Sequence, residues 1–304
     1  MSIRLSTRAS SAALALSTLL LAACGSSNNT TGGGGGATPN GITATKVASI
    51  AAEVPSAIAA KGTLTVAADA SYAPNEFFDT DGKTVIGMDA DLAKALAEVM
   101  GLKADVVNAA FDSILPGLTS GKYDLGASSF TDTKDREKTV DFVTYFTAGT
   151  SFFVKASGGP AINTLDDLCG QHVSVEKGTT QQDDATAQDT KCKGAGKPGV
   201  DVQIFPDQSG ANLALSSGRV DASMADSPVA AYQVKQSNGA FKLSGQPYGT
   251  APYGLATNKG NGLDKPVLDA VKELIRNGIY KRLLDKWGVA TGAISNPQIN
   301  GAQS

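Results

Sequence analysis

The amino-acid sequence predicts an α/β protein built from two similar lobes. Segments with strand and helix patterns alternate from residue 63 onward, and 304 residues with 41% hydrophobic content are enough for two separate cores. In addition, the segment 118–124 (LTSGKYD) returns as 215–221 (LSSGRVD). A similarity of this length can also arise by chance, so the repeat alone leaves a single large domain open.

Each copy of this repeat has the pattern of a helix end followed by a strand. Gly121 and Gly218 supply the left-handed residue that ends a helix, and a short apolar run follows each of them. The runs lead to a polar residue, Ser129 in the first copy and Asp226 in the second. Because α/β sheets bind ligands beyond the carboxyl ends of their strands, two facing copies would place these residues on opposite sides of one cleft.

The N-terminal segment has the features of an export signal. Two arginines precede an apolar stretch at 12–23 that is too short to span a bilayer as a helix. It ends in LAAC, and small residues before Cys24 resemble the lipobox of bacterial lipoproteins, in which the cysteine is acylated. We therefore expect a lipoprotein signal peptide at 1–23, with a plain secretory signal and a chance cysteine as the alternative. Residues 24–45, rich in Ser, Asn, Thr and Gly, would form a flexible linker from the lipid anchor.

The charge balance and hydropathy exclude some partners. The chain has 26 Lys and Arg against 29 Asp and Glu, and removal of residues 1–23 makes the mature chain more acidic. A nucleic-acid-binding protein would need a basic face, so nucleic acid is not an expected partner. No later stretch reaches the roughly 20 apolar residues of a transmembrane helix, so we expect a tethered rather than an embedded protein.

Two cysteines remain besides the one in the lipobox. Cys169 and Cys192 form an even pair in a chain that carries an export signal. Because extracytoplasmic compartments are oxidising, this pair predicts a disulfide, with two unrelated buried thiols as the alternative.

The first part of the compact domain has the pattern helix, strand, helix, strand. Residues 46–60 have a modest helical pattern, and a strand follows at 63–67. Apolar residues at helical spacing predict a helix over 87–101, with Asp89 as a cap of the first turn and a glycine at its end. The next strand is expected at 103–107.

Several separate segments resemble one protein family. They are KGTLTV (61–66), DASYAP (69–74), GMDADLAK (87–94), FDSILPGLTSGKYD (111–124), SSFT (128–131), GTT (178–180) and the segments 136–141, 221–226 and 280–287. In this order, over residues 61–288, they resemble the polar amino-acid-binding proteins of ATP-binding-cassette importers, bacterial extracellular solute-binding protein family 3.

The resemblance implies a type II periplasmic-binding-protein fold, in which two α/β lobes are joined by two crossing strands and close on a ligand. It divides the chain into the first part of lobe 1 with an N-terminal helix at 46–148, lobe 2 at 149–252, a return to lobe 1 at 253–288 and a C-terminal tail at 289–304. The chain would cross between the lobes near 147–152 and again near 248–254.

The resemblance also assigns partners to the charged groups of an amino acid, which must be compensated when the ligand leaves water. It places Arg136 at the α-carboxylate, with help from Thr131 and from the backbone up to Thr180 at a helix start. Asp226 and Ser129 match residues that receive the α-ammonium group. From the residues alone, Arg136 would instead belong to a charged surface run and Asp226 would cap a helix before a proline.

The remaining expected site residues surround the ligand side chain. Tyr72 and Phe111 match positions whose rings flank it, and Ser128 belongs to the same motif as its neighbour Ser129. Asp69 matches a position near the far end of the ligand. The family pattern is commonly apolar at Asn75, which leaves the shape of that wall open.

The expected charges favour a basic amino acid. Asp69 and Glu176 would remain as unpaired carboxylates after the ligand backbone is satisfied, and a cationic side chain would compensate them. However, Asp69 also occurs in relatives that bind neutral glutamine, and Glu176 could turn outward to Lys177. Glutamine therefore stays open beside lysine, arginine and ornithine.

An enzyme and a sensor are the rival functions. The same fold hosts a few periplasmic dehydratases, but the sequence has a single histidine, His172, in an expected strand, and neither a catalytic-triad spacing nor a metal-ligand cluster. We therefore expect no enzyme activity, no cofactor and no metal. The expected partners of this monomer are a small amino-acid ligand, the transmembrane permease of the importer and, through Cys24, the outer face of the cell membrane. A tethered amino-acid sensor is the alternative to a transporter subunit.

Overall fold

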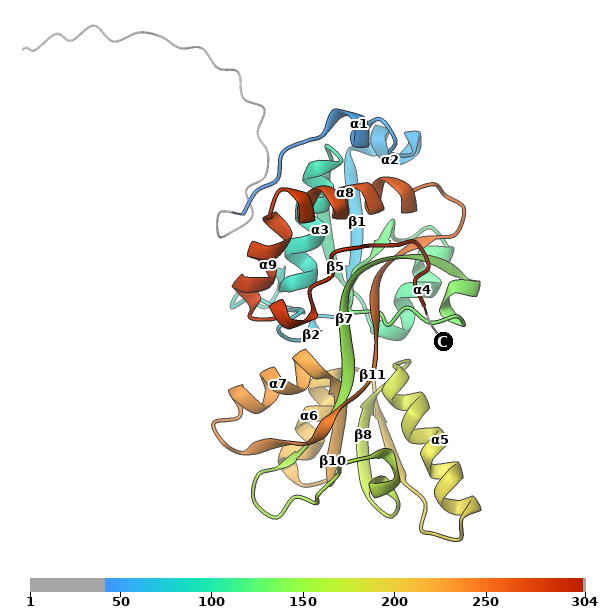
Figure 1. The fold of residues 1–304 in the computed structure, drawn as a ribbon, viewed down its shortest axis with the longest axis vertical. Coiled ribbons are helices and arrows are strands. Elements are labelled where there is room, and N and C mark those ends of the chain that lie inside the picture. The colour runs from blue at the N-terminus through green and yellow to red at the C-terminus, as the bar shows by residue number, and fades with distance from the viewer. Residues whose placement is uncertain (1–41, 303–304) are drawn as a thin grey trace, which may run out of the picture. The chain divides into compact units, whose positions relative to one another are not determined.

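Two long strands, β7 (Val140–Lys155) and β11 (Phe241–Asn258), connect two lobes of the protein. In Figure 1 they run from the upper lobe to the lower one and cross between them. The structure, a computed structural model, describes residues 42–302. The predicted signal peptide at 1–23, the lipidated Cys24 and most of the linker at 24–45 lie outside the described residues.

The first lobe, the upper one in Figure 1, contains the elements at both ends of the described chain. They are α1 (Ala48–Ala51), α2 (Ser56–Lys61), β1 (Thr63–Ala68), β2 (Ser71–Tyr72), β3 (Glu76–Phe78), β4 (Val85–Ile86), α3 (Met88–Val99), β5 (Lys103–Asn108), α4 (Phe111–Thr119), β6 (Leu125–Gly126), η1 (Arg136–Lys138), α8 (Asp264–Arg276), α9 (Ile279–Trp287) and η3 (Ala290–Gly292). The second lobe contains η2 (Leu165–Leu168), β8 (His172–Glu176), α5 (Thr180–Gly194), β9 (Asp201–Phe205), α6 (Gln208–Ser217), β10 (Ala222–Asp226) and α7 (Ser227–Gln236).

The main sheet has the same arrangement in both lobes. Its order is β5-β1-β6-β11-β7-β10-β8-β9. In the first lobe β1 pairs in parallel with β5 and β6, and β6 lies antiparallel to β11. In the second lobe β8 pairs in parallel with β9 and β10, and β10 lies antiparallel to β7. The main sheet therefore contributes three parallel strands and one antiparallel connecting strand to each lobe, and helices flank it, which confirms the two-lobed α/β prediction.

The sequence repeat occupies equivalent places in the two lobes. Gly121 (φ 76°) and Gly218 (φ 78°) are both left-handed at the ends of α4 and α6. In the first copy the carboxylate of Asp124 accepts from the backbone N–H of Thr65 at 2.7 Å, at the start of β1. In the second, Asp221 accepts from the N–H of His172 at 2.9 Å, at the start of β8. The aspartate of each copy thus fixes the neighbouring parallel strand, so the similarity is structural and did not arise by chance.

The helix predicted over residues 46–60 is wrong as a single element. Two short helices, α1 and α2, replace it, and Pro55 directly precedes α2. Proline has no backbone N–H for the helical hydrogen bond to the preceding turn, which favours a break between the two helices at Pro55. Residues before α1 also belong to the first lobe, because the N–H of Val47 donates to the carbonyl of Val99 at 2.9 Å.

Asp89 does not cap α3, contrary to the sequence prediction. The helix begins after Gly87 (φ 129°), where an added Cβ would lie 2.2 Å from the backbone oxygen of Asn75. This close approach lets the N–H of Asp89 donate to Asn75 O at 2.9 Å, and that of Met88 to Pro74 O. The first turn is therefore capped by backbone carbonyls, and the buried carboxylate of Asp89 is available for other contacts.

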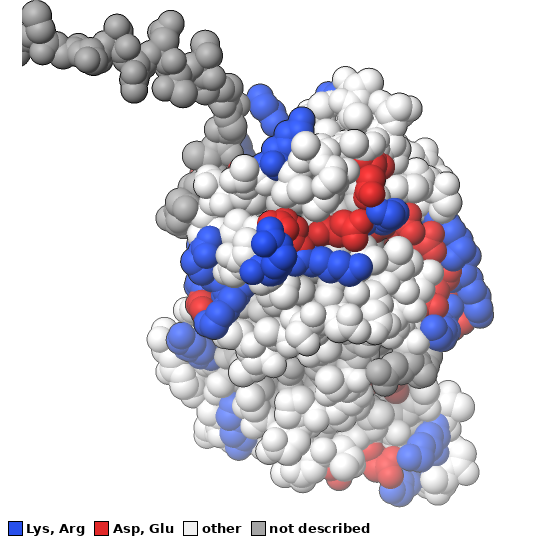
Figure 2. Space-filling view, turned by 45° about the horizontal axis from the view of Figure 1, so that its top comes forward, with Lys and Arg blue, Asp and Glu red and all other residues white. Residues whose placement is uncertain are grey.

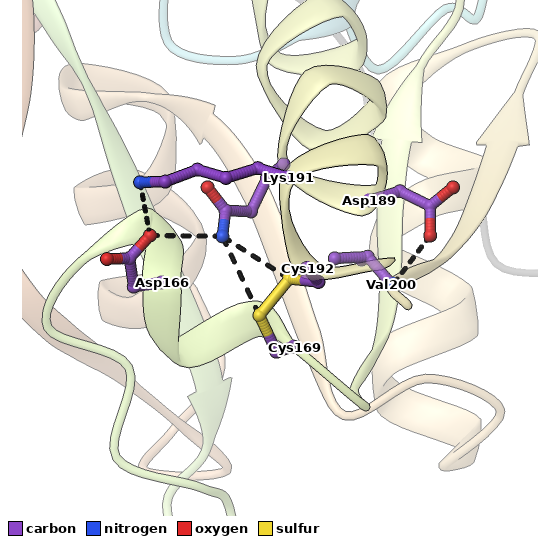
Figure 3. The surroundings of a disulfide bond; sticks show 7 residues. Asp166, Cys169, Asp189, Lys191, Cys192 and Val200 are labelled. Carbon is purple, nitrogen blue, oxygen red and sulfur yellow. Dashed lines mark hydrogen bonds and ion pairs between the residues drawn. A yellow bond between two sulfur atoms is a disulfide. The ribbon is translucent and has the colours of Figure 1, made fainter. Parts of the chain in front are cut away.

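The predicted disulfide between Cys169 and Cys192 is confirmed. It joins the end of η2 to α5, with the two Cα atoms 5.6 Å apart. Figure 3 shows the bond beside Lys191, whose ammonium pairs with Asp166 at 2.7 Å. Gln188 donates to the same carboxylate at 3.1 Å, so covalent and polar contacts together hold α5 on the second lobe.

Acidic and basic side chains alternate on the surface. Figure 2 shows them side by side on the upper part of the molecule. The first lobe has ion pairs of this kind, such as Lys265 with Glu53 at 2.6 Å and with Asp269 at 2.9 Å. Exposed pairs contribute little stability, so they matter mainly for solubility. Within residues 42–302, none of the helices combines the length and the apolar character needed to cross a membrane.

Candidate functional site

A small pocket lies between the lobes, at the carboxyl ends of their parallel strands. Its lining residues are Asp69, Tyr72, Phe111, Ser128, Ser129, Thr131, Arg136, Glu176, Thr179, Thr180, Gln181 and Asp226. The structure thus brings all ten residues of the expected site together and adds two more, Thr179 and Gln181.

Arg136 reaches across the pocket from η1 in the first lobe. One guanidinium nitrogen donates to the carbonyl of Thr131 at 2.8 Å, and the other donates to that of Gly178, in the second lobe, at 2.9 Å. The guanidinium also lies 5.5 Å from the centres of the Phe111 and Phe130 rings, which stack on each other. Burial lowers the pKa of Arg136, but a guanidinium stays charged in proteins, so a cation is fixed at this wall.

Asp226 lies opposite, at the end of β10. It holds the position of helix cap before α7, yet its side chain makes no capping hydrogen bond. Instead the carboxylate accepts from the side-chain amide of Gln181 at 2.8 Å, while the backbone N–H donates to the hydroxyl of Tyr72 at 3.0 Å. The cap interpretation is therefore wrong for the side chain, and the carboxylate is directed to the pocket.

Ser129 has an unusual backbone conformation that a buried network supports. Its φ is 48°, in the left-handed region, which a non-glycine residue adopts only when its surroundings hold it there. The carboxylate of Asp89 accepts from the N–H of Ser129 at 2.6 Å and from the hydroxyl of Tyr145 at 2.6 Å. Asn75 donates to the Ser129 hydroxyl at 2.8 Å but is not among the residues that line the pocket. The wall whose shape the sequence did not predict is therefore formed by Ser129, and Asn75 supports it.

Asp69 and Glu176 complete the pocket with two more buried carboxylates. Asp69 accepts from the backbone N–H groups of Phe111 at 3.0 Å and of Ser71 at 3.1 Å. In contrast, Oε1 of Glu176 is buried and has no hydrogen-bond partner. The pair of Lys177 is Asp112, at 2.7 Å, so Glu176 does not turn outward.

Burial controls the electrostatics of these carboxyl groups. It raises the pKa values of Asp69 and Asp226, and it raises that of Glu176 well above the usual range. The neighbouring charges of Asp69 and Asp207 raise the pKa of Glu176 further. A cation placed between these groups would relieve both effects, because it favours their ionised forms.

The sequence profile of the bacterial extracellular solute-binding proteins, family 3, matches residues 64–290. This chain belongs to that family. Solved structures of similar chains are type II periplasmic amino-acid-binding proteins, which is the fold that the sequence predicted. One of them, an ancestral arginine-binding protein bound to arginine, has a TM-score of 0.68 and 39% identity, and the match covers 74% of this chain and 98% of the other.

Two curated relatives show how wide the family is. The arginine-binding protein of Corynebacterium glutamicum is 34% identical over 255 residues, which cover 84% of this chain and 83% of that protein. The L-cystine-binding protein of Escherichia coli is 32% identical over 229 residues, which cover 75% of this chain and 83% of that protein. Family membership therefore leaves the ligand of this solute-binding protein to be argued from its own pocket.

Sequence reasoning missed part of the site of this family 3 protein. Gln181 follows directly after Thr180 and could have been found as the next residue in the first turn of α5. Asp89 and Asn75 carried no such signal, because they act on Ser129 from segments far apart in the chain. Among residues 42–302, no cluster of three or more His, Cys, Asp or Glu side chains has the arrangement of a metal site.

Proposed function

We propose that this protein is the extracytoplasmic, lipid-anchored binding subunit of an ATP-binding-cassette importer, and that its ligand is a basic amino acid of the arginine type. The observation that carries the ligand class is the charge of the pocket. Three buried carboxyl groups, Asp69, Glu176 and Asp226, surround it, and Arg136 is the only cation among the lining residues.

The charges of arginine match this arrangement. Arg136 compensates the α-carboxylate, and Asp226 compensates the α-ammonium group. Glu176 and Asp69 remain for the side chain, and the unpartnered Oε1 of Glu176 would accept from a guanidinium. Tyr72 and Phe111 supply ring surface for the aliphatic part of the ligand. A neutral side chain would leave this buried oxygen without a charged donor, and an acidic one would be repelled.

The membership in family 3 and the names of the relatives support the binding of an amino acid and a role in an importer. The name of the arginine-binding protein of Corynebacterium glutamicum supports arginine, whereas that of the cystine-binding relative supports a ligand whose side chain has no net charge. The pocket of this chain favours the former, because cystine would bring no net positive charge to Glu176.

Calorimetric titration tests the ligand class. Protein stripped of endogenous ligand by unfolding and refolding would be titrated with arginine, lysine, glutamine, cystine and glutamate. Arginine should bind at least about tenfold more tightly than glutamine, a difference of about 1.4 kcal/mol, and glutamate should not bind measurably. Equal affinity for glutamine and arginine would contradict the charge argument, while a protein that binds none of the five would contradict the whole proposal.

The transport role and the anchor need separate tests. Deletion of the gene should lower uptake of labelled arginine by whole cells, and the wild-type gene should restore it; an unchanged uptake would favour the sensor. For the anchor, Cys24→Ser should leave the protein uncleaved or soluble, because cleavage and lipid attachment share this residue. Cleaved Cys24→Ser protein that still fractionates wholly with membranes would contradict the lipid anchor.

A further inference from the structure

The last residues of the described chain form an additional contact layer on the first lobe. We call residues 298–302 the C-terminal strap. Ile299 forms an isolated β-bridge with Val143 of β7 and packs on the core of the lobe. The carbonyl of Gln298 accepts from the N–H of Thr144 at 2.9 Å, and its own N–H donates to the Thr144 hydroxyl at 2.8 Å. In Figure 1 the dark red segment runs across β7 in the upper lobe.

Asn300 fixes the strap most firmly. Its N–H donates to the carbonyl of Phe142 at 2.9 Å, and its side-chain oxygen accepts from the N–H of Phe142 at 2.9 Å. Its side-chain nitrogen donates to Asp141 at 2.9 Å. The φ of Asn300 is 54°, a conformation that asparagine tolerates better than most residues. The turn at Asn300 directs the following residues toward the segment that carries Arg136.

Two carboxylates of that segment receive the strap. We call residues 131–138 the arginine loop. The N–H of Gly301 donates to Asp132 at 2.8 Å, and the N–H of Ala302 donates to Glu137 at 3.1 Å. Asp132 directly follows Thr131, and Glu137 directly follows Arg136. Thr131 and Arg136 are the residues of the loop that line the pocket, and each is therefore followed by a residue that is hydrogen-bonded to the strap.

The arginine loop needs support of this kind. Beyond the single turn η1 and an isolated β-bridge of Thr131 with Tyr253, it has no regular secondary structure, and Lys134, Asp135 and Lys138 are exposed. On the side of the connecting strand β11, it is held by the N–H of Asp132, which donates to the carbonyl of Pro252 at 2.9 Å. The strap adds the contacts on its other side, and a charged group that must meet a carboxylate in fixed geometry depends on the residues that orient it.

We propose that the C-terminal strap is a positioning element of the binding site, which holds the arginine loop so that Arg136 faces the ligand carboxylate. This inference rests on the proposed function, because it assigns the strap a role in ligand binding. The strap itself contains none of the residues that line the pocket.

Truncation after Pro297 tests this role. In calorimetric titration with arginine, the truncated protein should bind about tenfold more weakly than the full chain, which is within the range for residues that act on a site without touching the ligand. Asn300→Ala, which removes two side-chain hydrogen bonds and keeps the chain length, should weaken binding in the same direction. If the truncated protein does not fold, as judged by circular dichroism, Asn300→Ala provides the test in its place.

A double-mutant cycle separates positioning from a general loss of structure. Both strap variants would be made again in an Arg136→Lys background. A lysine cannot make the bidentate contact of a guanidinium with the ligand carboxylate, so that contact is already lost there. A positioning role predicts a loss of less than about twofold there, because the strap acts through Arg136. An equal loss in both backgrounds, or no loss in either, would overturn the inference. Wild-type protein that binds no amino acid would overturn the proposed function, and this inference with it.

Discussion

Arg136 donates to Thr131 in its own lobe and to Gly178 in the other, so its guanidinium is held in place by two backbone carbonyls. Carbonyls leave the positive charge uncompensated, unlike a carboxylate partner. Among the neighbouring carboxylates, Asp226 across the pocket raises the pKa of Arg136 most, although burial outweighs this effect. This arrangement supports the proposed contact of Arg136 with the carboxylate of an amino-acid ligand.

Arg136→Ala should weaken every amino-acid ligand by about 3 kcal/mol, which is more than a hundredfold in Kd, because it leaves the ligand carboxylate buried without a partner. Titration calorimetry measures the loss. Arg219→Ala is the matched control, since Arg219 is exposed and lies over the Phe205 ring, outside the pocket. A similar affinity loss in both variants would contradict the role of Arg136.

Glu176 should make arginine binding depend on pH. In the free protein, burial and the neighbouring carboxylates hold the pKa of Glu176 well above the usual range, so it keeps a proton at a pH where ordinary carboxyl groups have lost theirs. A cationic side chain binds the ionised form, so ligand binding releases this proton. Affinity should therefore rise with pH, by up to about tenfold per pH unit, until Glu176 is ionised in the free protein.

Glu176→Gln provides the comparison for this pH profile. The amide keeps the shape and cannot titrate, so the slope of log Kd against pH should become shallower, with only the contributions of Asp69 and Asp226 left, and arginine should lose much of its preference over glutamine. A wild-type profile that is already flat between pH 5 and pH 8 would argue against Glu176 as the group that receives the ligand cation.

At the scale of elements, α5 carries pocket residues at its first turn but has few apolar residues of its own. The buried positions of this 15-residue helix are Gln181, Ala185, Gln188 and Cys192. Burial of so little apolar surface contributes little to the packing of the helix on its lobe. The disulfide to Cys169 and the contacts of Gln188 and Lys191 with Asp166 take this role.

Reduction of the disulfide should therefore destabilise the protein. The bond closes a loop with a sequence separation of 23 residues, for which chain entropy corresponds to about 3 kcal/mol of stabilisation. Urea unfolding with and without a phosphine reductant, on protein lacking residues 1–24, measures the change in the free energy of unfolding. Titration of two free thiols in the denatured, unreduced protein would show that the bond does not form.

For the whole molecule, contacts between the lobes surround the pocket. The N–H of Gln208 donates to the hydroxyl of Ser71 at 3.0 Å, and Lys177 pairs with Asp112 at 2.7 Å. At the same edge, Gly178 (φ 79°) faces Asp112 so closely that an added Cβ would lie 3.0 Å from the Asp112 Cβ. The structure is thus a closed form, in which the lobes are in contact beside Arg136.

Gly178→Ala should oppose closure and weaken arginine binding by about tenfold, because the new methyl group meets the first lobe and the backbone there is left-handed. Small-angle scattering should show a smaller ligand-induced decrease in the radius of gyration. Gly196→Ala controls for the backbone strain, since Gly196 has φ 72° and nothing within 4 Å of an added Cβ. If both variants bind like the wild type, the contact at Gly178 does not limit closure.

The sequence, through its repeat and its resemblance to family 3, determined the two-lobed fold and ten of the twelve residues that line the pocket. The repeat could be recognised because its glycine, its aspartate and the residue that follows the strand are local features, and Ser129 and Asp226 take the same place in each lobe. The cysteine pair could be predicted for a similar reason, since it needs only the number of cysteines and the compartment.

Only the tertiary structure decided how these residues are held. The inward direction of Glu176, the use of Asp89 behind Ser129 and the bonds from Gly301 and Ala302 to the arginine loop all join segments that are far apart in the chain. Local sequence patterns report on propensity within a few residues, whereas a buried carboxylate takes whichever donors the packed chain brings to it. For that reason the pocket could be located from the sequence, but its electrostatics and its support could not.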